Sequence, residues 1–207
     1  MKRRKFILNT TLSVIAMSFS PLLKAGNKIG KGKKITILHT NDTHSNIDPF
    51  PSNHPKYPGM GGVAKRAALI EKIRKEEENV VLLDSGDIFQ GTPYFNTFKG
   101  ELEMKLMTYM GYDAATMGNH DFDIGLDGFL NAKQYAEFPF VCSNYDFDKT
   151  ILAGKTQKNC IIKRGGIRIG IFGIGIALEG LISGGNCVNV VYLDPIKTAN
   201  EQAEELK

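Results

Sequence analysis

Three short apolar segments, each followed by a polar loop and then a helical pattern, constrain the fold of this chain more than any other feature. They span residues 33–40, 79–83 and 114–117, and the second is apolar at four consecutive positions. An uninterrupted apolar run is typical of a buried strand with both faces covered. Strands that alternate with helices therefore predict an α/β layered fold, with helices on both faces of the sheet.

The helical patterns are amphipathic. After Gly62, apolar side chains recur at Val63, Ala67 and Ile70, which places them on one face of a helix. The methionines of the second pattern, at positions 104, 107 and 110, are expected to be buried in the same way. The other predicted elements are helices at 101–110, 129–136 and 196–206 (capped by Asp194), a strand at 138–143, and a hairpin at 160–163 and 167–174.

The first 25 residues have the parts of a secretory signal in the expected order. Basic residues at positions 2–5 precede a mainly apolar stretch that ends at a small-residue cleavage sequence, Leu23-Lys24-Ala25. Arg3-Arg4 resembles a twin-arginine export signal. The alternative is a membrane anchor, although the apolar stretch is short for a full span. We predict a signal peptide in residues 1–25, a linker in 26–32 and a folded domain in 33–207.

The charge of the chain, +4, originates in this N-terminal segment. Residues 1–25 hold five of the 26 Lys and Arg residues and none of the 22 Asp and Glu residues. The remainder has 21 basic and 22 acidic residues, a net charge of −1. This balance argues against a nucleic-acid polymer as ligand, because such binding needs a broad positive field. A phosphate-bearing ligand must be held locally.

The three cysteines do not favour a metal or disulfide scaffold. Cys142, Cys160 and Cys187 lack C-x-x-C spacing and are odd in number. One bridge between Cys160 and Cys187 is compatible with an oxidising compartment. Cys142 lies in an apolar run and is expected in the core.

Side chains able to do chemistry follow each of the three predicted strands, where ligands bind in α/β folds. Asp42 and His44 follow the first, and residues i and i+2 of extended backbone point to the same side. Asp87 follows the second, and its two oxygens can bridge two cations. Asn119, with a neutral oxygen, and His120, directed elsewhere, follow the third.

Each motif also has a structural explanation, such as an Asx turn or a polar loop. Their combination, D-x-H, G-D and G-N-H-D at successive strand ends, is far more specific than any one alone. His39 is expected to pack or to bond the backbone, and His54 to be solvated. The glycines at 165–175 do not form a dinucleotide loop, because no strand-to-helix context surrounds them.

The motifs resemble those of the calcineurin-like metallophosphoesterases. Longer strings are similar to the branch of 5′-nucleotidases and 2′,3′-cyclic-nucleotide phosphodiesterases. The resemblance implies that family's layered β-sheet fold with flanking helices, incomplete at the C-terminus. The strings are ILHTNDTH at 37–44, GGVA at 61–64, LDSGD at 83–87 and MGNHDFD at 117–123.

The resemblance also implies two divalent metal ions. Asp42 and His44 would hold the first, Asp87 would bridge both, and Asn119 would bind the second. Two such cations polarise the phosphoryl oxygens and activate a water molecule. The mixed nitrogen and oxygen ligands suit Mn, Zn, Fe, Co or Ni without distinguishing among them.

By the same resemblance, His120 would be the catalytic histidine, with Asp123 orienting it and holding it charged. A charged imidazole can stabilise the transition state or protonate the leaving group. The substrate would be a small phosphate ester such as a nucleotide. Export implies the bacterial periplasm or the extracellular space, with no stable membrane span after signal cleavage.

The family's metal sites require further histidines from two later loops, one of them in a G-H-x-[HQ] segment. The four histidines of this chain are at positions 39, 44, 54 and 120. The expectation is a truncated form of a phosphoesterase. One alternative is a non-catalytic exported module or pseudoenzyme, and another is a hydrolase of a different oxyanion ester. Coding sequence downstream of Lys207 that supplies the histidine loops would favour truncation.

For the 207-residue chain, we expect negligible hydrolysis of AMP or bis-p-nitrophenyl phosphate with added Mn²⁺, because a binuclear site that lacks several ligands loses most of its metal affinity. Phosphate and p-nitrophenol release measure this. Robust turnover that His120→Ala abolishes would contradict the expectation.

Overall fold

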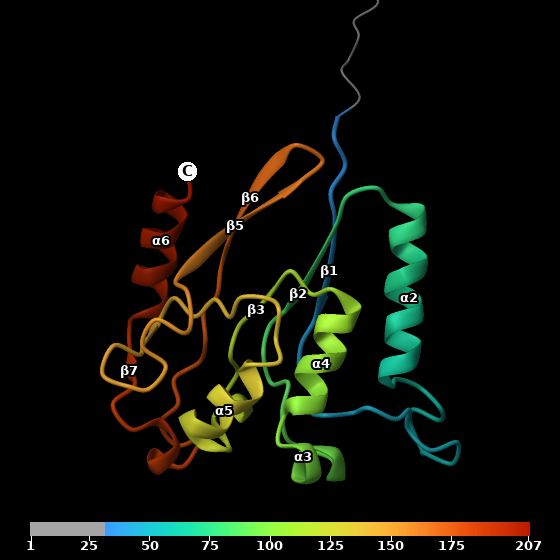
Figure 1. Cartoon of the computed structure of the whole chain (residues 1–207), viewed down its shortest axis with the longest axis horizontal. Coiled ribbons are helices and arrows are strands. Elements are labelled where there is room, and N and C mark those ends of the chain that lie inside the picture. Colours follow the sequence, from blue (N-terminus) through green and yellow to red (C-terminus); the bar gives the residue numbers. More distant parts are fainter. Residues whose placement is uncertain (1–31) are drawn as a thin grey trace, which may run out of the picture. The chain divides into compact units, whose positions relative to one another are not determined.

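Three parallel strands form the central sheet. β1 (Thr36–Thr40), β2 (Val80–Asp84) and β3 (Ala114–Ala115) lie in the order β1-β2-β3 (Figure 1). The register pairs Thr40 with Asp84 and Asp84 with Ala115, so the three strands end at one edge. This computed structural model describes residues 32–207. The predicted signal peptide, and the linker up to residue 31, lie outside the described residues.

Four helices pack with the sheet around one hydrophobic core. The core joins Leu82 of β2 and Ala115 of β3 to buried residues from each helix, including all three methionines predicted to be buried. The methionine prediction is therefore confirmed. The helices are α2 (Val63–Glu76), α3 (Pro93–Phe98), α4 (Glu101–Met110) and α5 (Gly125–Lys133) (Figure 1).

The prediction that the first strand is buried, with helices on both sheet faces, is wrong at β1. Ile37 is 59% exposed, and His39 is also exposed, while Leu38 packs against the core. Within residues 32–207, β1 pairs only with β2 and is an edge strand. One face of an edge strand can remain open, and an apolar run alone does not reveal this.

The predicted hairpin is confirmed as β5 (Asn159–Arg164) and β6 (Ile167–Phe172), an antiparallel pair. Gly165 and Gly166 connect them with φ of 56° and 75°. Two consecutive positive φ values fit the type I′ turn, whose twist matches paired strands.

The C-terminal helix is confirmed as α6 (Pro195–Glu205), and the Asp194 side chain accepts the Lys197 N–H at 2.7 Å. It packs on the hairpin, where Asn159 donates to Gln202 at 2.8 Å. The remaining short elements are η1 (His120–Phe122), β4 (Tyr145–Asp146), η2 (Gly184–Cys187) and β7 (Val191–Tyr192).

Several predicted boundaries differ from the structure. The strand predicted at 138–143 is reduced to two isolated bridges, at Phe140 and Val141. Pro139 lacks an N–H to donate, and only its carbonyl is used, by Ala115 at 3.0 Å. Helix α3 was not predicted, because Pro93 reads as a loop signal although proline is well tolerated at the first helical position. The third predicted helix begins earlier, at Gly125.

Cys142, Cys160 and Cys187 all carry free thiols, so the Cys160–Cys187 bridge is not formed. Cys142 is buried, as expected for a core residue. In the part of the chain that the structure describes, no helix has the length and apolar character that a membrane span requires.

We predict that Met104→Ala lowers the free energy of unfolding by about 2–5 kcal/mol, because it leaves a cavity in the core. Met104 is fully buried, whereas Tyr109 on the same helix is 84% exposed. Tyr109→Ala is therefore the matched control, with a change within about 0.5 kcal/mol. Urea unfolding measures both, and equal losses would contradict the assigned burial.

Candidate metal centre

Two loops run side by side beyond the sheet edge, one after β1 and one after β2. Three backbone hydrogen bonds join them: Asp42 N–H to the Gly86 carbonyl at 3.0 Å, His44 N–H to the Asp87 carbonyl at 3.1 Å, and Ser45 N–H to the Ile88 carbonyl at 2.9 Å. The pairing of the parallel strands thus continues into the loops, which brings the predicted residues together.

Asp42, His44 and Asp87 form one cluster. Each offers a ligand atom, and these atoms all lie within 4.8 Å of one another. Two carboxylates and an imidazole at this separation are a donor set that suits a divalent transition-metal ion. The donor chemistry therefore fits the metal that the sequence predicts.

The backbone reason for this convergence differs from the prediction, which assumed an extended chain. Asp42, His44 and Asp87 have φ of 49°, 44° and 55°, in the left-handed region. Among residues 32–207, the two paired loops supply most of the non-glycine residues with positive φ. Such conformations are unfavourable, and they persist where the surrounding structure imposes them, often at functional sites.

The His44 ring is oriented by the second loop. Its Nδ1 lies 3.1 Å from the Phe89 carbonyl oxygen, which can only accept a hydrogen bond. Nδ1 therefore carries the proton and Nε2 remains free as a ligand atom. Nε2 lies 3.7 Å from Asp42 Oδ1, on the side of the cluster.

The Asp87 carboxylate lies against the loop after β3. Its Oδ1 accepts the His120 N–H at 2.8 Å. A Cβ at Gly118 would lie 2.2 Å from Asp87 Oδ1, so only glycine allows this close approach. The loop after β3 therefore packs closely against one side of the Asp87 carboxylate.

His120 and Asp123 form a second pair beside the cluster. His120 Nδ1 lies 2.7 Å from Asp123 Oδ2, across the short turn of η1. The hydrogen bond to Asp123 raises the pKa of His120, nearby carboxylates add to the effect, and desolvation opposes it. The His120 ring stands edge-on to that of His44, with centroids 5.1 Å apart. Asn119 immediately precedes His120 and is half-buried, and its part as a ligand remains a prediction.

Two buried carboxylates in these motifs were not predicted to have a role. Asp121 accepts four backbone N–H groups from the loops after β2 and β3. Asp84 accepts from Thr40 Oγ1 at 2.5 Å and from the Gly86 N–H at 2.8 Å. Desolvation raises the pKa of Asp121 to about 7 and that of Asp84 to about 6, against the hydrogen bonds that favour the ionised forms. The sequence signal available for Asp84 and Asp121 was an acidic side chain within a recognised motif. That signal does not indicate whether the side chain is buried.

A cavity of about 420 Å³ adjoins Asp42. His39, expected to be packed, is exposed and lines this cavity together with Arg66. His54 lies outside it, and its Nδ1 accepts the Tyr57 N–H at 2.9 Å within the same loop.

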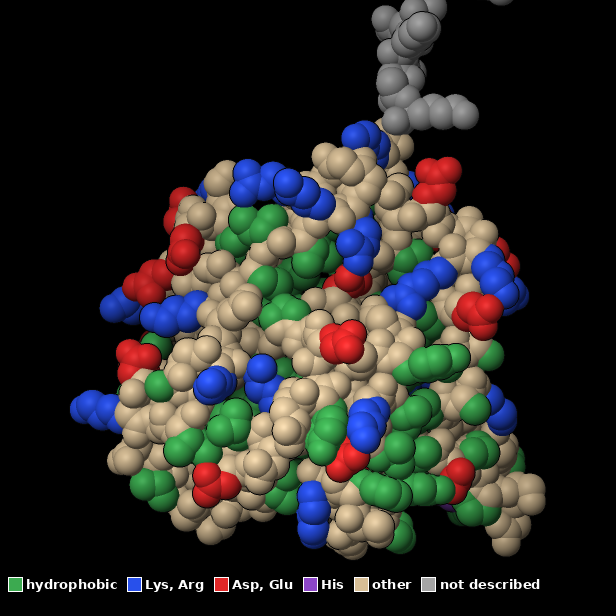
Figure 2. All heavy atoms as spheres, viewed as in Figure 1, with side chains coloured by type: hydrophobic (Ala, Val, Ile, Leu, Met, Phe, Trp, Pro, Cys, Tyr) green, Lys and Arg blue, Asp and Glu red, His purple; other side chains and the backbone are tan. Residues whose placement is uncertain are grey.

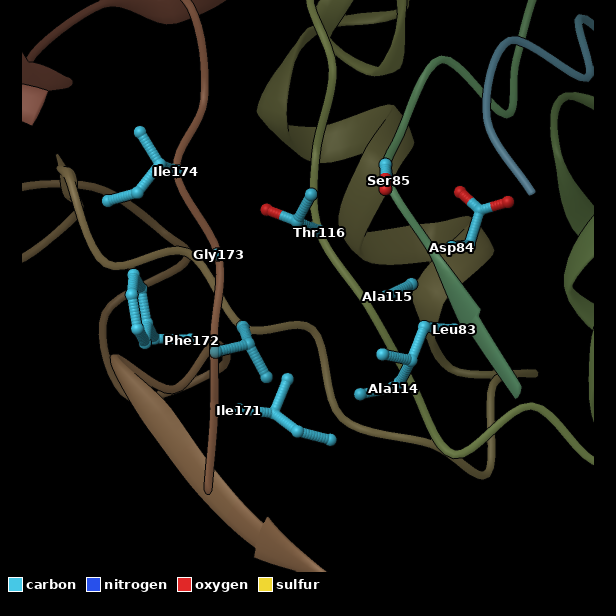
Figure 3. A pocket seen from close by; sticks show the side chains of 11 residues that line it. Leu83, Asp84, Ser85, Ala114, Ala115, Thr116, Ile171, Phe172, Gly173 and Ile174 are labelled. Carbon is cyan, nitrogen blue, oxygen red and sulfur yellow. The ribbon is translucent and has the colours of Figure 1, made fainter. Parts of the chain in front are cut away.

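A second cavity, of about 170 Å³, lies between residues 171–174 and the ends of β2 and β3 (Figure 3). Its lining includes Asp84, Ser85 and Thr116 beside apolar side chains, and none of the predicted site residues. On the face shown in Figure 2, basic and acidic side chains are interspersed. The mixed charge on this face favours local binding over a broad basic surface.

Comparison with known proteins identifies the family. Residues 35–205 match the family described as Calcineurin-like phosphoesterase. The chain belongs to this family. The predicted resemblance and fold class are thereby confirmed.

Relatives of this phosphoesterase chain include 5′-nucleotidases. It is 40% identical to a snake venom 5′-nucleotidase of Gloydius brevicauda over 147 residues, which cover 68% of this chain and 25% of that protein. It is 32% identical to the mouse 5′-nucleotidase over 182 residues, covering 84% of this chain and 31% of that protein. The phosphoesterase chain thus spans about a quarter to a third of these relatives.

The fold of the phosphoesterase chain is also found in solved structures. A 5′-nucleotidase precursor from Thermus thermophilus superposes with a TM-score of 0.73 at 33% identity. The match covers 83% of this chain and 34% of that one. The described part therefore corresponds to a portion of a larger nucleotidase structure.

We predict that Asp123→Asn lowers the pKa of His120, because the hydrogen bond and charge that raise it are lost. NMR titration of the His120 ring proton in wild type and in the variant measures the shift. Since the folded pKa is raised, the pair stabilises the fold below the unfolded value of about 6.5, and this contribution is lost as pH rises through the folded pKa. An unchanged His120 titration would contradict this prediction.

Proposed function

We propose that this chain is part of a two-metal phosphoesterase that hydrolyses small phosphate esters, and nucleotides in particular. The convergence of Asp42, His44 and Asp87 within 4.8 Å is the observation that carries the proposal. The adjoining His120–Asp123 pair supplies a proton donor. Metal ligands and a charged imidazole are the two requirements of such a hydrolysis.

In this proposal, Asp42 and His44 would hold the first metal ion, Asp87 would contribute to both, and Asn119 would hold the second. The ions are Mn, Zn, Fe, Co or Ni. Two such cations would polarise the phosphoryl oxygens and lower the pKa of a water molecule. The hydrogen bond from His44 to the Phe89 carbonyl keeps Nε2 available for its metal.

His120 acts on the leaving group. Its Nδ1 is occupied by Asp123, so Nε2 is the atom left to donate a proton. The raised pKa favours the protonated ring, the form that can donate to a departing alkoxide. Asp123 orients the ring and balances its charge.

The names of the relatives support nucleotides as substrates, since the mouse and Gloydius brevicauda proteins are 5′-nucleotidases. The absence of a broad positive field in the sequence outside residues 1–25 also favours a small ligand over a polymer. We further infer that residues 33–207 are the N-terminal part of a catalytic domain.

We also propose export to the periplasm or the extracellular space. Residues 1–25 carry the signal pattern described above. The naming of one relative as a venom protein, and of another as a precursor, is consistent with secretion.

In the protein expressed from the complete reading frame, we expect His120→Ala to lower kcat for AMP by about 10²–10⁴-fold, because the proton donor is lost. Phosphate release with Mn²⁺ measures this. His54→Ala is the matched control, since His54 is a half-buried histidine outside the centre, and it should retain activity. Equal rates for His120→Ala and wild type would reject the proposed role.

A further inference from the structure

Asp121 is the most completely enclosed acidic side chain near the centre. It is 0% exposed. Its Oδ2 accepts the N–H groups of Asp87 and Gly118, both at 2.9 Å. Its Oδ1 accepts those of Ile88 at 3.0 Å and Phe89 at 3.2 Å. Within residues 32–207, the hydrogen bonds of this carboxylate all come from these four N–H donors, an arrangement that suits an acceptor-only group.

These bonds act on the backbone that carries the ligands. Asp87 has a left-handed φ of 55°, which is unfavourable without external support. Asp121 holds the N–H of that residue and of the two that follow. The short turn η1, which contains Asp121, also carries His120, and the His120 N–H donates to Asp87 Oδ1 at 2.8 Å. One carboxylate thus joins the loop of the bridging ligand to the turn of the proton donor.

We propose that Asp121 is a positioning residue of the metal centre: it holds the Asp87 backbone so that the Asp87 carboxylate faces Asp42 and His44. The inference rests on the proposed function for its consequence in metal binding. The positioning itself concerns only this chain's own atoms. Asp121 also accepts the Phe89 N–H. Phe89, whose carbonyl orients His44, therefore belongs to the same hydrogen-bonded unit.

Asparagine at this position tests the proposal sharply. It keeps the shape of the side chain but replaces one acceptor oxygen by an NH₂ group, which only donates. Whichever way the amide turns, two backbone N–H groups lose their acceptor. Asp121→Asn therefore removes positioning at one pair of amides without creating a cavity.

A matched control is Asn144→Asp, the reverse exchange at another residue that is 0% exposed. Asn144 bonds the N–H and carbonyl of Gly175, at 2.8 and 2.9 Å, and none of the centre's residues. A variant that merely loses stability should resemble this control. The unfolding temperatures of both variants, each compared with wild type, show how much stability each one loses.

The first measurement is amide hydrogen exchange by NMR in the 207-residue chain without metal. In wild type, the N–H groups of Asp87, Ile88, Phe89 and Gly118 should be protected and should exchange as one group. In Asp121→Asn, one pair of amides should lose protection, either Asp87 and Gly118 or Ile88 and Phe89. In Asn144→Asp, both pairs should stay protected. Unprotected or independently exchanging wild-type amides would overturn the proposal, even if the variant fails to fold.

The second measurement is the Mn²⁺ affinity, by titration calorimetry, of the protein expressed from the complete reading frame, because a centre that lacks several ligands is expected to bind metal weakly. Asp121→Asn should bind about 10–100-fold more weakly than wild type, as for other residues that orient metal ligands. Asn144→Asp should bind as wild type. Equal affinity in all three proteins overturns the positioning role. A wild-type protein from the complete reading frame that binds no Mn²⁺ contradicts the proposed metal centre instead, and the exchange measurement then decides the positioning of Asp87 alone.

Discussion

The parallel pairing of β1 with β2 is the constraint on which the rest of the site depends. It places Thr40 beside Asp84, and three further backbone hydrogen bonds join the loops that follow the two strands. Parallel strands end at the same edge, so side chains that are far apart in the sequence become neighbours there. The cluster of Asp42, His44 and Asp87 is a direct consequence of this continued pairing.

Below that edge of the sheet, buried carboxylates accept hydrogen bonds that the backbone N–H groups of the loops would otherwise make to water. Asp84 and Asp121 together satisfy the backbone N–H groups of the β2 loop from Gly86 to Phe89. Burying a carboxylate is costly, and its raised pKa reflects that cost. The cost is offset by hydrogen bonds that fix a loop with several left-handed residues. Rigidity at the centre thus comes from polar contacts as well as from the core.

Sequence patterns predicted the elements whose signals are local. The turn at Gly165-Gly166, the cap at Asp194 and the buried methionines of α4 all depend on neighbours within a few residues, and all are confirmed. Predictions failed where a distant segment decides the outcome. The exposure of Ile37 depends on what covers β1, and the strand at 138–143 depends on the partners available around Pro139.

The sequence by itself determined which residues could serve the centre, because D-x-H, G-D and G-N-H-D follow three strand signals in order. It also determined the family to which they belong. Only the tertiary structure decided how these residues converge, through left-handed backbone instead of an extended chain. It alone also placed Asp121 under two loops, 0% exposed. The physical reason is that burial and backbone strain are set by contacts between segments distant in the chain, which no local pattern encodes.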